Sequence, residues 1–150
     1  MSVVMTAAAI GKRMNDIPVL IIDANSSNRL LLSEMICSLY MKPVTVADAT
    51  LALSISRHVG EMGNPFQLVI IDADHPAIVE DGFTEKIHQQ IGIENARIIL
   101  IYGKNSLMLE NPEMRIVNVR RPIDIAVLKG IVSQVFQQWP MKLDEANIGQ

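Results

Sequence analysis

Residues 68–76 read LVIIDADHP, four apolar residues followed directly by two acids, a histidine and a proline. The apolar run is short, contains β-branched residues and does not alternate with polar ones, which is typical of a parallel strand covered on both faces. The change to acidic residues marks the point where the strand leaves the core. We therefore expect a buried strand whose end presents Asp72 and Asp74 at the edge of a sheet.

Five such apolar runs recur along the chain, and helix-length segments separate them. The predicted strands are Pro18–Ile22, Pro43–Val46, Phe66–Ile71, Arg97–Ile101 and Arg115–Val119. This alternation of strand and helix predicts an α/β fold with a parallel sheet, covered on both faces and connected by right-handed crossovers.

Three of the intervening segments carry clear helical periodicity. Arg29–Tyr40 follows candidate caps at residues 26–28 and repeats large apolar residues at spacings of three and four. Two further stripes predict helices after the second and fifth strands: Leu51, Ile55 and Val59, then Val127, Ile131 and Val135, widened by Leu128, Val132 and Phe136. Weaker helix candidates are Phe83–Ile91 and Lys104–Met114, the second interrupted by Asn111-Pro112.

Length and composition favour one cytoplasmic domain with protein or small-molecule partners. A chain of 150 residues suits a single core, and a net charge of −3 supplies no basic field for nucleic acid or an anionic membrane. The single cysteine, Cys37, is expected to be a small buried residue in a reducing compartment. We expect a domain at 17–139, a linker or leader at 1–16 and a tail at 140–150, as in a segment of a longer chain.

The predicted sheet brings several polar residues to its carboxyl edge, where the carboxyl ends of the parallel strands meet. In open α/β sheets ligands bind outside this edge. Asp23, Asp72, Tyr102 and Arg121 each lie at or just beyond the end of a predicted strand. They are candidates for a shared pocket, although any such sheet ends its strands on polar residues.

Three stretches, VLIIDANSSNRLLLSEMI, FQLVIIDADHP with the later DGF, and VRRPID, resemble the motifs of response-regulator receiver domains. The resemblance runs from Ile17 to Trp139, and residues 28–32 are similar to receivers of hybrid sensor histidine kinases. It implies a doubly wound, flavodoxin-like sheet of order 2-1-3-4-5. It also implies that Asp72 occupies the position that accepts a phosphoryl group from a phosphohistidine.

The sequence departs from the receiver pattern at the implied magnesium site. Receivers place two acids after the first strand, and here the pair reads Asp23-Ala24, so the acid that contacts the metal directly is missing. Losing one carboxylate at about 4 Å forfeits on the order of 4 kcal/mol of attraction at an effective dielectric of about 20. Asp23, Asp72 and Asp74 are thus expected to form at most a weak Mg²⁺ site, with Asp74 as the compensating ligand. The cofactor is Mg²⁺ if the site functions, and the alternative is a chain that needs no cofactor.

Two further departures concern the other positions of the implied site. Tyr102 stands where receivers have a serine or threonine, and its ring is expected to fill or cover the pocket. Arg121 stands where they have a lysine before a proline and, usually, a cis peptide bond. A guanidinium is a planar fork rather than a compact ammonium. We expect Arg121 to pair bidentately with Asp72 and hold it permanently.

The segment between Tyr102 and Arg121 also differs from the pattern, because it contains ENPEM. This predicts a fourth helix that is shortened, displaced or absent. In receivers the surface built from that helix is where dimers and output partners dock, so we expect an altered partner surface, including a homodimer through a non-standard surface.

Our preferred hypothesis is a degenerate receiver, or pseudo-receiver, of a two-component phosphorelay that acts mainly through contacts with a histidine kinase, a phosphotransfer domain or neighbouring domains of a parent chain. Such a chain would be cytoplasmic, also as part of a membrane-anchored sensor kinase. The first alternative is a working phosphoacceptor of a hybrid sensor kinase phosphorelay, with Asp72 as nucleophile and Asp23 and Asp74 holding Mg²⁺. In this alternative Arg121 is the electrostatic clamp. The second is a small-molecule sensor with Tyr102 as a lid. No motif for independent catalysis is present.

Overall fold

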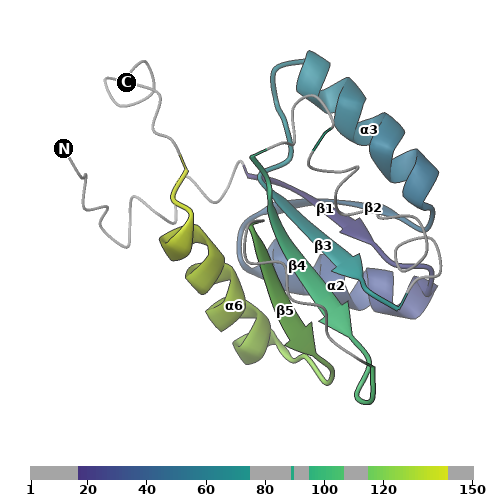
Figure 1. Ribbon diagram of the computed structural model, residues 1–150, viewed down its shortest axis with the longest axis vertical. Coiled ribbons are helices and arrows are strands. Elements are labelled where there is room, and N and C mark those ends of the chain that lie inside the picture. Colours follow the sequence, from purple (N-terminus) through teal and green to yellow (C-terminus); the bar gives the residue numbers. More distant parts are fainter. Residues whose placement is uncertain (1–16, 75–88, 90–94, 107–114, 142–150) are drawn as a thin grey trace.

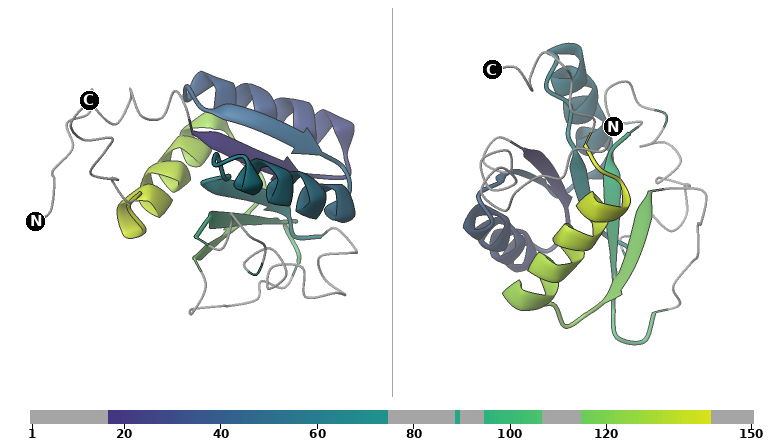
Figure 2. Two further views of the ribbon diagram at one scale, coloured as in Figure 1. Left: turned by 90° about the horizontal axis from the view of Figure 1, so that it is seen from above. Right: turned by 90° about the vertical axis from the view of Figure 1, so that its left-hand side faces the viewer.

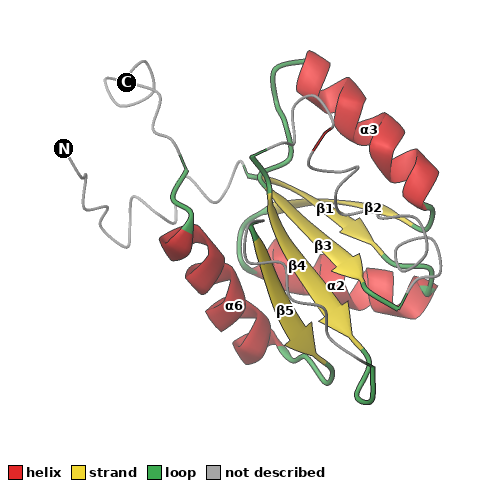
Figure 3. Cartoon of the chain, viewed as in Figure 1, coloured by secondary structure: helices red, strands yellow, loops and turns green. Residues whose placement is uncertain are grey.

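The computed structural model describes residues 17–74, 89, 95–106 and 115–141. In these residues the chain forms a parallel sheet flanked by helices (Figures 1 and 3). The elements in chain order are β1 (Pro18–Ile22), α2 (Ser26–Ser38), β2 (Lys42–Val46), α3 (Ala49–Glu61), β3 (Leu68–Asp72), β4 (Arg97–Tyr102), β5 (Ile116–Arg120) and α6 (Ile125–Gln138).

The strands lie in the order β2-β1-β3-β4-β5, and every neighbouring pair is parallel. This is the doubly wound, flavodoxin-like order that the resemblance to receiver domains implied. β1 has the predicted bounds, and the other strands differ from prediction by one or two residues at one end or at both ends. Because the order reverses between β1 and β3, the ends of these two strands form the switch point where α/β sheets bind ligands.

Both faces of the sheet are covered by apolar side chains, as the lack of polar alternation predicted. Ile70 and Ile71 are neighbours in β3, both are 0% exposed, and they belong to clusters on opposite faces. Residues of α3 pack in the cluster of Ile71, whereas residues of α2 and α6 pack in that of Ile70. Figure 2 shows the sheet between these helices.

Each described helix begins at a polar side chain that accepts from a backbone N–H in the first turn, the usual role of an N-cap. Asn25 caps α2, Asp48 caps α3 and Asp124 caps α6. The cap of α2 therefore precedes the candidates at residues 26–28. This position starts the helix directly after β1, so its first turn lies beside Asp23.

The buried faces of the helices differ in detail from the predicted stripes. Leu51 is 49% exposed, and α3 instead buries its small residues Ala49, Ala52 and Ser56. Val127 is 41% exposed, and α6 buries Leu128, Val132 and Val135. Both helices have the predicted periodicity, but the buried face of each is shifted by about one residue from the predicted stripe. Large apolar residues flank the positions that contact the sheet.

Cys37 corrects a second expectation, because it is exposed and forms no disulfide. It follows Ile36 in α2, which is buried against the sheet. A step of one residue turns a helix by about 100°, which carries Cys37 from the covered face towards solvent.

Several predictions fall on residues outside the described ranges. These are the leader at 1–16, the tail beyond 141 and nearly all of the helix candidates Phe83–Ile91 and Lys104–Met114. The expected change in the fourth helix therefore stays a prediction. Of the helices that the described ranges contain, none has the length and apolar character that a membrane crossing requires.

Candidate functional site

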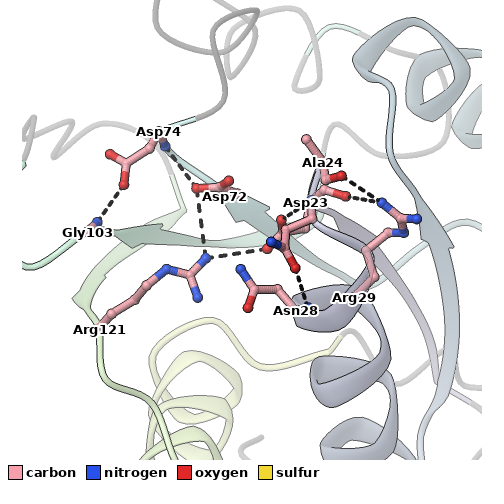
Figure 4. A network of polar contacts seen from close by, with 9 residues as sticks. Asp23, Ala24, Asn28, Arg29, Asp72, Asp74, Gly103 and Arg121 are labelled. Atoms are coloured by element: carbon pink, nitrogen blue, oxygen red, sulfur yellow. Dashed lines mark hydrogen bonds and ion pairs between the residues drawn. The ribbon is translucent and has the colours of Figure 1, made fainter.

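Asp23 lies at the centre of a polar network at the carboxyl edge of the sheet (Figure 4). It follows β1 directly and is 0% exposed. Its Oδ1 accepts the backbone N–H of Asn25 at 2.9 Å, and Nη2 of Arg121 lies 3.3 Å from its Oδ2. A buried carboxylate needs such partners, because burial without hydrogen bonds or an opposite charge is costly.

Arg121 joins Asp23 to Asp72. The same Nη2 that contacts Asp23 lies 3.9 Å from Oδ1 of Asp72, an ion pair beyond hydrogen-bond distance. The predicted bidentate pair with Asp72 is therefore wrong: the guanidinium bridges two carboxylates and hydrogen-bonds the more buried one. The peptide bond from Arg121 to Pro122 is cis, as the resemblance implied.

Asp72 ends β3, and its side chain is 17% exposed. Burial raises the pKa of Asp72 above its ordinary value of 3.8. The backbone hydrogen bond from Asp74 lowers this pKa, and the nearby charge of Asp23 raises it again. Arg121 also lowers it, but burial is the larger effect. The carboxylate thus has a weaker preference for the charged form than a solvated aspartate.

Asp74 turns away from Asp23 and Asp72. Its Oδ2 accepts the backbone N–H of Gly103 at 2.7 Å, and its Oδ1 accepts the hydroxyl of Ser106 at 2.7 Å. Figure 4 shows the carboxylate of Asp74 directed at Gly103, while its backbone N–H points to Asp72. Both oxygens of the expected compensating ligand are therefore engaged elsewhere.

The side chains at this edge do not fit the magnesium ion that the resemblance implies. Ala24 offers no ligand, Asp74 is engaged by the turn after β4, and Nη2 of Arg121 occupies the space beside Asp23 Oδ2 and Asp72 Oδ1. Mg²⁺ requires oxygen ligands at about 2.0–2.1 Å in octahedral geometry. Within the described part of the chain, no three acidic, histidine or cysteine side chains gather as a metal-binding group.

The side chain of Tyr102 is buried and does not cover the carboxyl edge of the sheet. It is 5% exposed and packs in the cluster that also contains Leu100, Ile71 and Ala73. β4 alternates its side chains between the two faces of the sheet, so Tyr102 follows Ile98 and Leu100 onto the face of α3. The ring thus adds to the core beside the site.

Residues that the sequence did not single out complete the network. Arg29 donates from Nη1 to the carbonyl oxygens of Asp23 at 2.8 Å and Ala24 at 3.1 Å. Arg120 donates from Nη1 to the carbonyls of Gly103, Lys104 and Ser106. Arg29 and Arg120 both lie within the motifs quoted above, but nothing in the sequence indicates that they would bind backbone carbonyls.

Comparisons with known proteins agree with the fold. The chain has a TM-score of 0.65 to a CheY-like response regulator receiver domain from Methylobacillus flagellatus, with 22% identity, covering 79% of this chain and 98% of that one. It has a TM-score of 0.63 to the chemotaxis protein CheY4 of Vibrio cholerae, with 18% identity over 79% and 98% of the two chains. The receiver domain of the hybrid histidine kinase CckA gives 0.61, with 19% identity over 80% and 99%.

No protein-family model matches the sequence, and no curated protein matches it. The likeness therefore rests on the three-dimensional structure. It confirms the predicted resemblance at the level of the fold: the chain has the fold of CheY-like response regulator receiver domains, and a receiver of a hybrid kinase is among its structural neighbours.

Proposed function

We propose that this chain is a degenerate receiver domain of two-component signalling, which acts mainly through protein contacts and accepts phosphate on Asp72 weakly or not at all. The observation that carries the proposal is the bridge that Arg121 makes between Asp23 and Asp72. A cation of the chain itself already neutralises part of the charge that a metal ion would neutralise. This arrangement is what we expect of a pocket that does not depend on a metal ion.

The chemistry of phosphoryl transfer supports this reading. Charge develops on the transferring group, and catalysis depends on preorganised cations that stabilise it, usually including a divalent metal ion. Ala24 removes a metal ligand, and Asp74 is held by Gly103 and Ser106. Arg121 supplies a single positive charge shared between two carboxylates. Asp72 is thus at the right place in the fold but lacks the electrostatic support for efficient transfer.

The partners we propose are a histidine kinase, a phosphotransfer domain or neighbouring domains of a longer protein in the cytoplasm. The fold supports this class of partner, because receivers of response regulators and of a hybrid histidine kinase are its structural neighbours. The bounds of the domain, 17–139, belong to the same proposal, with the flanking segments serving as connections.

The alternative is a working phosphoacceptor. Its support is the position of Asp72, which ends β3 beside the switch point of the sheet and keeps 17% of its side chain exposed. On this alternative Arg121 would move towards the phosphoryl group and release Asp23 for Mg²⁺. A small-molecule sensor has less support, because Tyr102, its expected lid, is packed in the core.

Intact-mass spectrometry with Mg²⁺ and acetyl phosphate separates these functions. We expect no phosphoryl adduct on the wild-type chain. A variant carrying Ala24→Asp, Tyr102→Thr and Arg121→Lys restores the receiver pattern, so it is expected to gain one phosphoryl group.

The matched control adds Asp72→Asn to that variant and is expected to abolish the gain. A phosphoryl adduct on the wild-type chain that disappears with Asp72→Asn alone would overturn the degenerate assignment and establish the alternative. Melting curves against a metabolite panel address the sensor hypothesis, which a flat panel would remove.

A further inference from the structure

The turn at residues 103–106, which follows β4, is held from both sides by charged side chains of the neighbouring strands. Asp74, just after β3, accepts from the Gly103 N–H and from the Ser106 hydroxyl, each at 2.7 Å. Arg120, the last residue of β5, donates to three carbonyls of the turn, at distances of 3.3, 3.2 and 2.6 Å. The acid thus satisfies donors of the turn, and the arginine satisfies its acceptors.

Gly103 makes the contact with Asp74 possible. A Cβ atom at this position would lie 2.7 Å from Oδ2 of Asp74 and 3.2 Å from Oγ of Ser106. The first separation is shorter than real Cβ atoms show, so any side chain at residue 103 would displace the carboxylate. The absence of a side chain is therefore a requirement of this contact.

The same groups connect the turn to the site. The backbone N–H of Asp74 donates to Oδ1 of Asp72 at 3.1 Å, and Arg120 is followed in sequence by Arg121, which bridges Asp72 and Asp23. Polar contacts thereby connect Asp72, Asp74, the turn and Arg120, and the peptide bond from Arg120 to Arg121 closes the ring at Asp72. The ring is complete with the protein's own side chains.

We propose that Asp74 is a positioning residue that fixes the turn 103–106 in one arrangement without any ligand or phosphoryl group at Asp72. Together with Arg120 it keeps this turn in a constant shape. This fixation of the turn by Asp74 does not depend on the proposed function above.

Amide hydrogen exchange measured by NMR on the full chain, without Mg²⁺ or a phosphodonor, tests the proposal. In Asp74→Ala the amide of Gly103 loses its acceptor, and we expect its exchange to accelerate about tenfold or more, since a hydrogen bond to a charged group contributes about 1.5–3 kcal/mol. Ser106→Ala removes one of the two contacts and is expected to have a smaller effect of the same sign. The amide of Ile99, in the middle of β4, reports global opening and is expected to stay unchanged.

Two glycine variants give a matched pair. Gly103→Ala places a methyl group against Asp74 and is expected to accelerate exchange at residues 103 and 106, whereas Gly130→Ala meets nothing within 4 Å and is expected to leave it unchanged. Exchange at Gly103 that stays within twofold of wild type in both Asp74→Ala and Ser106→Ala would overturn the proposal. That result would leave the phosphorylation experiment untouched, and a phosphorylated wild-type chain would conversely leave this one untouched.

Discussion

At the scale of single residues, the site depends on which cation stands beside two carboxylates. Arg121 contacts both Asp23 and Asp72 through one nitrogen, so its charge is divided between them. A guanidinium remains protonated at all physiological pH values, and its planar shape cannot be replaced by an ammonium without changing these contacts. Burial is the main cause that raises the pKa of Asp72, and the charge of Arg121 offsets only part of this effect.

Asp72→Asn is expected to raise the melting temperature near neutral pH. The folded state raises the pKa of Asp72, so between 3.8 and that raised pKa the folded state binds more protons than the unfolded state and loses stability as pH rises. Asparagine keeps an oxygen that can accept the Asp74 N–H and carries no charge to desolvate.

Thermal unfolding of wild type and Asp72→Asn across pH 3–8 measures this effect. The stabilisation is expected to be full at neutral pH and to disappear below about pH 4, where aspartate is protonated in both states. An asparagine variant that is less stable than wild type at pH 7 would show that the ion pair with Arg121 outweighs burial.

At the scale of elements, strand positions could be predicted from the sequence and side-chain partnerships could not. The runs ending in Asp23 and Asp72 are buried on both faces, and their composition shows this locally. The direction of Asp74 depends on Gly103 and Ser106, which are 29 and 32 residues away, and on the shape of a turn. No local sequence pattern encodes that contact. The sequence therefore led to the prediction that Asp74 is a metal ligand.

Another contact between residues far apart in sequence lies at the amino ends of the strands, where β4 begins. Arg97 is 1% exposed and donates from Nε to the carbonyl of Trp139 at 2.6 Å and from Nη1 to the carbonyl of Gln67 at 3.1 Å. Its guanidinium lies over the ring of Phe136, 4.4 Å from the centroid. Burial, together with the charge of Arg115, lowers the pKa of Arg97 to about 10, so Arg97 stays charged at neutral pH. Its hydrogen bond to Trp139 connects the end of α6 to the sheet.

Arg97→Met is expected to reduce the free energy of unfolding by about 2 kcal/mol, because the carbonyls of Gln67 and Trp139 lose a charged donor in a buried place. Urea denaturation followed by circular dichroism measures the change. Arg57→Met is the matched control, since Arg57 is exposed in α3 and pairs with Glu61 one turn away. Its effect is expected to stay within about 0.5 kcal/mol, and equal losses in both variants would refute the role of the buried contacts.

At the scale of the whole molecule, one sheet separates two apolar clusters, and β1, β3 and β4 contribute to both. Side chains on the two faces belong to the same strands. Loss of packing in one cluster therefore disturbs the backbone that supports the other cluster. The described domain is therefore expected to unfold as one cooperative unit.

Ile71→Ala tests this cooperativity, because it removes buried atoms from the cluster on the face of α3. The expected loss is about 3 kcal/mol. Fluorescence of Trp139, the single tryptophan, reports the opposite cluster, against which it packs. We expect the urea transition seen by fluorescence to shift together with that seen by circular dichroism. Leu31→Ala, at a side chain 50% exposed, serves as the control with little shift, and separated transitions would indicate two independent units.

The parallel pairing of all five strands also has a consequence for synthesis on the ribosome. β1 is enclosed between β2 and β3, and β3 is joined to it only after α2, β2 and α3 have been made. Parallel neighbours cannot close as a hairpin, so at least one edge of β1 stays unpaired until β3 has been made. We therefore expect residues 18–22 to be a segment that holdase chaperones can bind on the nascent polypeptide until the third strand has left the exit tunnel.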